Sequence, residues 1–209
     1  MAECILVGNG GGGGSSSADY ITDGLIFWDK PLASEVQKEI TVIPNPTFDT
    51  SSALTVEVAV RIDNIPASDG YARVFELNSG SSTSYPLILG LGRRSDEVGT
   101  SSDYGVNLWA GNIDAYPQIP DLQFGDAHTF TYVCQSNVYS FYVDGVRIEG
   151  SWTLSSAMSR AITRIYLMHG STSNRVVTGH CYALRWYSRA LSNAEILQNR
   201  EIDEQLIAE

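Results

Sequence analysis

The residues best suited to bind a ligand lie close together in the middle of the chain. A flat aromatic ring can stack on the apolar face of a pyranose, while Asp and Asn side chains bond to its hydroxyl groups. One short stretch holds both kinds of side chain: Trp109, Asn112, Asp114 and Tyr116. Trp152 is a second aromatic residue that could be exposed. The pattern predicts a sugar-binding site, and the alternative is that Trp109 belongs to the core and the polar residues to turns.

Oxygen-bearing side chains just before this stretch could hold a metal ion. Calcium needs several oxygen ligands at once, and Asp96, Asp103 and Asn107 could supply some of them from a loop and the strand after it. Their spacing matches no known ligand loop, and acidic loops are commonly just solvated. No Cys/His cluster suggests zinc. We expect no obligatory cofactor, with calcium as an open alternative.

Carboxylate pairs decide whether the chain could hydrolyse glycosidic bonds. Such hydrolysis needs two carboxylates about 5–5.5 Å or about 6.5–9.5 Å apart across one cleft. Glu57 and Asp63 lie on one predicted strand without the required spacing, and we expect them to face solvent. The acidic pair Asp203-Glu204 is expected on a solvated helix face. The sequence therefore predicts a protein that is not an enzyme, with a glycoside hydrolase as a remote alternative.

Composition and charge exclude several classes of partner. The 209 residues include 24 acidic and 13 basic side chains, which gives a formal net charge of −11. Such a surface repels phosphates, so we expect no binding to nucleic acid. No apolar run reaches the ~18 residues of a membrane span, so no membrane insertion is expected. Neutral sugars and protein surfaces remain possible partners.

Alternating apolar residues indicate that most of the chain forms β-strands. Residues Leu54 to Ile62 alternate with Thr, Glu, Ala and Arg, which predicts a half-buried strand. Further strands are predicted at 24–28, 39–43, 73–77, 86–91, 105–110, 128–135, 138–143, 162–169 and 181–187. Asp144-Gly145 is a strong signal for a two-residue hairpin turn, because both residues tolerate positive φ. The predicted fold class is all-β: a two-sheet antiparallel sandwich.

The two ends of the chain differ from this strand-rich part. Ser192 and Glu195 fit a capping box at the start of a helix over 192–207. Residues 1–18 combine a short apolar tag with a Gly/Ser-rich linker, which predicts an extended arm before a domain over 19–209. Ile5, Leu6 and Val7 of the tag could add as a strand to the sheet edge of a partner. The N-terminus lacks the features of a signal peptide, so we expect synthesis and folding in the cytoplasm.

The three cysteines do not form a disulfide framework. Their number is odd and their spacing wide. Cys134 and Cys181 lie within apolar strand patterns, so we expect buried thiols that behave as small hydrophobic residues.

Four stretches resemble laminin G-like domains of the concanavalin A-like lectin/glucanase superfamily. They are Ile21–Trp28 (ITDGLIFW), Leu54–Val60 (LTVEVAV), Ser140–Val146 (SFYVDGV) and Ala183–Ile196 (ALRWYSRALSNAEI), and they occur in the family's order. The resemblance implies a jelly roll of two stacked antiparallel sheets. It also implies that Trp28 and Trp186 pack in the core.

The N-terminal arm is similar to another group of proteins. An apolar tag, a polyglycine run and then YITDGLIFW resemble structural proteins of phages and prophages. This resemblance implies a binding or adhesion module on a virion, tethered by its arm and directed at a surface glycan or host-surface protein. A ligand-free structural or decoration protein that stabilises a shell is the alternative.

Overall fold

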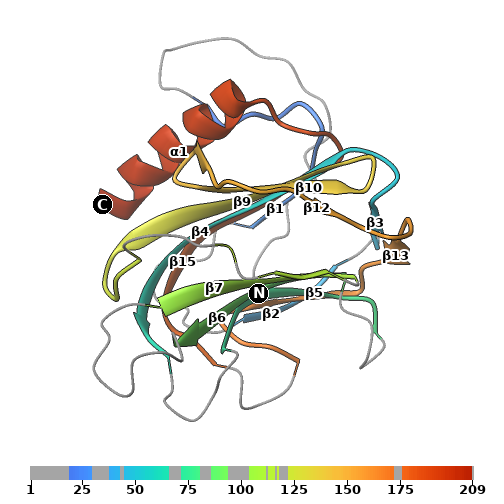
Figure 1. Ribbon diagram of the computed structural model, residues 1–209. Coiled ribbons are helices and arrows are strands. Elements are labelled where there is room, and N and C mark those ends of the chain that lie inside the picture. The colour runs from blue at the N-terminus through green and yellow to red at the C-terminus, as the bar shows by residue number, and fades with distance from the viewer. Residues whose placement is uncertain are drawn as a thin grey trace.

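Two antiparallel sheets face each other, and one helix lies over the outer face of one sheet (Figure 1). This computed structural model describes residues 19–29, 38–42, 45–65, 72–80, 86–93, 104–111, 113–115, 117, 122–171 and 176–208. The predicted N-terminal arm, including Ile5, Leu6 and Val7, lies outside the described residues. The fold class predicted from the sequence, an antiparallel β-sandwich with a C-terminal helix, is confirmed.

The seven-stranded sheet carries the helix. Its strands, in spatial order, are β1 (Leu25–Asp29), β15 (Thr178–Tyr187), β4 (Leu54–Asn64), β9 (Ala127–Gln135), β10 (Val138–Val143) and β11 (Val146–Arg147), with β12 (Trp152–Thr153) also paired to β10. Helix α1 (Asn193–Ala208) follows β15 directly. No helix in the described part of the chain is long and apolar enough to span a membrane.

The six-stranded sheet forms the second layer. In spatial order it contains β2 (Lys38–Thr41), β14 (Arg164–Leu167), β5 (Ala72–Asn78), β6 (Leu87–Arg93), β7 (Tyr104–Ala110) and β8 (Ile113–Ala115). A separate pair, β3 (Thr47–Asp49) and β13 (Ser159–Ala161), lies at one end of the sandwich (Figure 1). The short strands β3, β8, β12 and β13 were not predicted, because alternation cannot be recognised over two or three residues.

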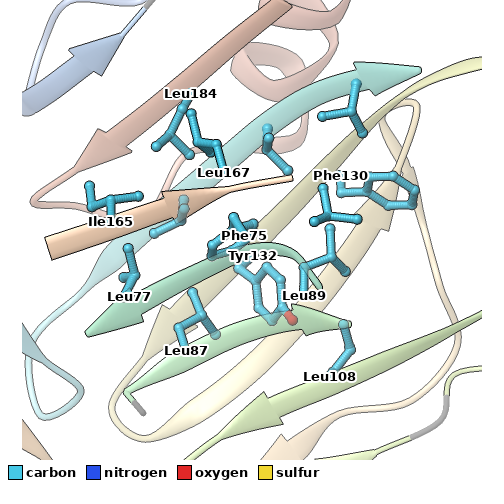
Figure 2. Close-up of a cluster of buried hydrophobic side chains, with 14 of the residues drawn as sticks. Phe75, Leu77, Leu87, Leu89, Leu108, Phe130, Tyr132, Ile165, Leu167 and Leu184 are labelled. Carbon is cyan, nitrogen blue, oxygen red and sulfur yellow. The ribbon is translucent and has the colours of Figure 1, made fainter. Parts of the chain in front are cut away.

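The core fills the space between the two sheets. Figure 2 shows Phe75 and Leu89 of the six-stranded sheet near Phe130 and Tyr132 of the seven-stranded sheet. The rings of Phe75 and Tyr132 meet edge to face, with centroids 6.0 Å apart. Each such side chain contributes about 1.5–3 kcal/mol when it is fully buried, so this layer supplies the main driving force for folding. Cys134 and Cys181 are buried free thiols, as predicted.

The hairpin turn and the helix start also match their predictions. Asp144 and Gly145 have φ angles of 50° and 76°, which fit a type I′ turn. The backbone N–H of Ser192 donates to Glu195 Oε2 at 2.7 Å, and the N–H of Glu195 donates to Ser192 Oγ at 3.4 Å. Because both signals depend on residues at most three apart, they could be recognised without knowledge of the fold.

The prediction that β4 is half-buried is wrong. Its alternating pattern indicates one face in solvent, yet residues 54–60 are buried on both faces. The reason is that Glu57, on the polar face of β4, bonds to buried side chains that include Asn199 of the C-terminal helix, so this face is covered.

Candidate functional site

A row of residues crosses the outer face of the six-stranded sheet. The row consists of cross-strand partners, one from each strand: Glu39, Tyr166, Glu76, Ile88, Trp109 and Asp114. Partners directly opposite each other in an antiparallel sheet lie on the same face. This register therefore gathers an acidic, aromatic and apolar surface from segments far apart in the sequence.

Trp109 is the exposed aromatic residue of this row. Its neighbours Leu108 and Ala110 on β7 point into the core, so alternation along the strand directs Trp109 to the outer face. The side chain is 40% exposed, although Ile88 opposite it is only 4% exposed. An indole ring that β7 holds partly in solvent can stack on a planar apolar surface of a ligand.

A buried polar cluster lies further along the same face, on β5. A register shift between Arg73 and Phe75 brings Arg73 to the same side as Glu76. The guanidinium of Arg73 forms an ion pair with Glu76, which also accepts hydrogen bonds from Asn78 Nδ2 at 3.0 Å and from the backbone N–H of Ser171 at 3.1 Å. The carboxylate is thus neutralised and bonded from within the protein.

The chain after β14 approaches this cluster closely. A Cβ on Gly170 would meet Arg73 Cδ at 2.6 Å, so only glycine fits there without movement of the arginine. The rings of His169 and Tyr166 meet edge to face, with centroids 5.3 Å apart. At the far edge of the sheet, Arg164 pairs with Glu39 at 3.1 Å, and both side chains are about half exposed.

The structure brings together only some of the residues predicted to bind a sugar. Asp114 is the cross-strand partner of Trp109, while Asn112 and Tyr116 lie outside the described residues. Trp152 lies elsewhere: it is half-buried on β12, packs against the core and lines a small cavity. Because that cavity is also lined by Leu108 and Ala110, Trp152 lies on the core side of β7 and Trp109 on the outer side.

The predicted calcium ligands fall in a region that the structure describes only in part. Asn107 is buried on β7, with its Oδ1 3.3 Å from the position that a Cβ on Gly90 would occupy. Asp96 and Asp103 lie outside the described residues. Among the residues that are described, no group of three or more His, Cys, Asp or Glu side chains could hold a metal ion.

The outer face of the seven-stranded sheet holds a charged cluster that the sequence did not predict. We call it the Arg185 network. It consists of Tyr20, Glu57, Thr129, Thr131, Arg185, Asn199 and Asp203. Arg185 donates from Nε to Glu57 at 3.0 Å and from Nη1 and Nη2 to Asp203 at 2.7 and 2.6 Å. All three charged side chains are 0% exposed.

Two predictions about carboxylates are therefore wrong. Glu57 does not face solvent: it also accepts bonds from Asn199 Nδ2 at 2.6 Å and Thr131 Oγ1 at 3.2 Å. Asp203 does not lie on a solvated helix face, although its neighbour Glu204 is exposed. One signal was available, since Asn199 and Asp203 are four residues apart and share one face of a helix.

Burial sets the electrostatics of the Arg185 network. Loss of solvation raises the pKa of Glu57, against the attraction of Arg185. Burial also opposes the charge on Arg185, but Glu57 and Asp203 together outweigh it and hold its pKa well above the ordinary value. The guanidinium further lies 4.4 Å from the centroid of the Tyr20 ring. The charged groups of the Arg185 network are thus paired with one another, and their bonds connect helix α1 to the seven-stranded sheet.

Comparison with solved structures places this architecture among known ones. The sialidase of Trypanosoma rangeli is 17% identical with a TM-score of 0.57, and the match covers 75% of this chain and 24% of the sialidase. The chain thus corresponds to about a quarter of that enzyme. Domain 4 of AbnA, a GH43 extracellular arabinanase from Geobacillus stearothermophilus solved in complex with arabinotriose, is 13% identical with a TM-score of 0.51, covering 73% of this chain and 69% of that domain.

A third similar structure is the SAP-like pentraxin from Limulus polyphemus. It is 13% identical with a TM-score of 0.53, and the match covers 77% of this chain and 80% of the pentraxin. At such identities the likeness shows the fold alone. Among curated proteins, none has a sequence that matches this chain.

Family membership follows from the sequence together with the fold. The sequence profile of the concanavalin A-like lectin/glucanases superfamily matches residues 35–197, which is most of the chain. The matched stretch runs from just before β2 to the first turn of α1 and so includes every strand of both sheets except β1. The chain belongs to the concanavalin A-like lectin/glucanases superfamily.

Proposed function

We propose that this chain is a non-catalytic glycan-binding module that binds its ligand at Trp109, on the outer face of the six-stranded sheet. The observation that carries the proposal is the 40% exposure of this indole beside a buried Ile88. The exposed part of a large aromatic side chain forgoes the free energy that burial would supply. Stacking against a sugar would recover part of it.

Two further features support this proposal. The acidic residue opposite Trp109, Asp114, is of a type that accepts hydrogen bonds from sugar hydroxyls. Domain 4 of the arabinanase was solved with arabinotriose, so a domain of similar fold accommodates a sugar in that protein. Neither the proposed stacking nor the hydrogen bonding requires a cofactor, and calcium at Asp96, Asp103 and Asn107 stays a prediction from the sequence.

The Arg185 network supports the non-catalytic part of the proposal. Glu57 and Asp203 both bond to Arg185, and both are fully buried, Glu57 on β4 and Asp203 on helix α1. A hydrolase needs carboxylates that reach a substrate from two sides of the bond to be cleaved. These two carboxylates are held by arginine and enclosed, so they cannot serve as an acid/base pair.

A glycan array tests the ligand and the site together. The wild-type chain should bind at least one surface glycan, and the substitution Trp109→Ala should abolish that binding. Val146→Ala is the matched control, because Val146 is 66% exposed but lies on β11 of the seven-stranded sheet. Binding that survives Trp109→Ala unchanged would contradict this site.

The N-terminal arm is proposed to attach the module to a larger assembly such as a phage virion. The proposal places the protein on the virion after synthesis in the host cytoplasm, with virion structural proteins as partners of Ile5, Leu6 and Val7. Deletion of residues 1–14 should abolish incorporation into particles while array binding persists. Unchanged incorporation would refute the tether.

A ligand-free structural or decoration protein is the second candidate. It is favoured by one observation: the polar groups Arg73 and Glu76, on the same face as Trp109, already satisfy each other. Silence across the array, together with incorporation into particles, would favour this candidate over the binding module.

A further inference from the structure

We infer that the ligand at Trp109 is the end unit of a neutral glycan, and neither an acidic sugar nor a chain that lies across the six-stranded sheet. The inference rests on the proposed function and adds to it a ligand class and a direction of approach. It follows from which charges on this face are already paired and which positions of the face are covered.

The charges on this face leave little for an anionic ligand to bind. Arg73 is buried and paired with Glu76, and Arg164 is paired with Glu39. Every arginine of the face whose side chain the structure describes is thus held by a glutamate. The residue opposite Trp109 is acidic, and the whole chain carries a formal charge of −11. An acidic sugar would lose its hydration here, and no arginine among the described side chains of this face is left unpaired to compensate for that loss.

The middle of the face is closed to a long ligand. Ile88 and Asn107, which flank Trp109 on the sheet surface, are 4% and 7% exposed. Beyond them, residues 169–171 lie against the face: Ser171 donates to Glu76, and His169 packs on Tyr166. An oligosaccharide laid across the strands would meet covered residues after leaving the indole. The accessible ring lies one strand from the β8 edge of the sheet, which suits the exposed end of a glycan.

Paired glycans test the charge requirement. We expect the wild-type chain to bind glycans that end in a neutral hexose, with lactose as one probe. Capping the same glycan with sialic acid, as in 3′-sialyllactose, should weaken binding by about tenfold or more, which corresponds to about 1.4 kcal/mol. A preference for the capped glycan would overturn the inference.

A length series tests the direction of approach. Calorimetric titration with the bound monosaccharide and with its di-, tri- and tetrasaccharides should give affinities within about threefold of one another, because only one unit contacts the ring. A rise of about tenfold from mono- to tetrasaccharide would show contacts along the chain and would overturn the inference.

The outcomes separate the inference from the proposed function. Binding that is lost in Trp109→Ala, kept in Val146→Ala, and limited to acidic or long glycans would refute the inference alone. No binding to any glycan on the array would refute both. Loss of binding to neutral end units in Trp109→Ala, with a flat length series, would support both.

Discussion

The two outer faces of the sandwich use polar residues in different ways. On the seven-stranded sheet, Arg185 lies beneath helix α1 and bonds to both Glu57 and Asp203, and all three side chains are 0% exposed. On the six-stranded sheet, Trp109 keeps 40% of its surface in contact with solvent. The comparison teaches that the buried charges of the Arg185 network attach helix α1 to the sheet, whereas an exposed aromatic residue marks the candidate binding surface.

The attachment of helix α1 to the sheet should be strongly destabilised when Arg185, the cation of the Arg185 network, is replaced. The substitution Arg185→Met leaves Glu57 and Asp203 buried without a counterion, so we expect the free energy of unfolding to fall by about 3–5 kcal/mol. Urea denaturation followed by circular dichroism measures this change. Arg61→Ala is the control, because the Arg61–Asp63 pair is over a third exposed and should matter by about 1 kcal/mol or less. Equal losses of stability in the two variants would show that the Arg185 network stabilises the protein no more than an exposed ion pair does.

The hairpin turn beneath α1 should show a smaller effect. Gly145 has a φ of 76°, and a Cβ there would collide with Leu197 of the helix. We expect Gly145→Ala to cost about 2–3 kcal/mol, from strain and overpacking together. Gly125→Ala shares the positive φ, at 94°, but meets nothing within 4 Å, so it should cost only about 1 kcal/mol. Thermal unfolding of both variants isolates the contact with α1, and equal melting temperatures would show that this contact carries no energy.

The start of α1 should respond to pH in a defined direction. Hydrogen bonds from Arg189, and then from the backbone N–H of Ser192, lower the pKa of Glu195 to about 2 from an ordinary 4.5. A lowered folded-state pKa means that Glu195 stabilises the protein above pH 4.5, and that this contribution is lost as the pH falls toward 2. NMR titration of the carboxyl carbon should give a midpoint near 2, and Glu195→Gln should remove the pH dependence at a cost of about 1 kcal/mol. A midpoint near 4.5 would contradict the capping geometry.

The open face should show the smallest effect on stability. Trp109→Ala removes a side chain that is 40% exposed, so the free energy of unfolding should fall by only about 1 kcal/mol. Trp186→Ala, at a residue that is 1% exposed, should cost about 3–5 kcal/mol in the same denaturation experiment. A large loss for Trp109→Ala would mean that this residue supports the fold instead of a ligand.

Local patterns in the sequence predicted much of the fold. Strand β10 was predicted with its observed bounds, Val138–Val143, and helix α1 within one residue at each end. These features depend on alternation, turn residues and capping side chains, all of which act over a few neighbouring residues. The placement of Trp109 on a strand was likewise predictable, but its exposure depends on which face of β7 packs against the core.

The sequence by itself determined the longer strands, the Asp144-Gly145 turn, the cap of α1 and the family, because each depends on residues close to one another in the chain. Only the tertiary structure decided which charged side chains are buried and which residues they pair with. Arg185 and Glu57 are 128 residues apart, and Asn199 and Glu57 are 142 apart. Alternation predicts that one face of β4 differs from the other, but it cannot tell whether water or a helix covers the polar face. The distant helix α1 decides this, because it covers the polar face of β4 and buries the Arg185 network. On the other sheet, Trp109 remains partly in contact with solvent.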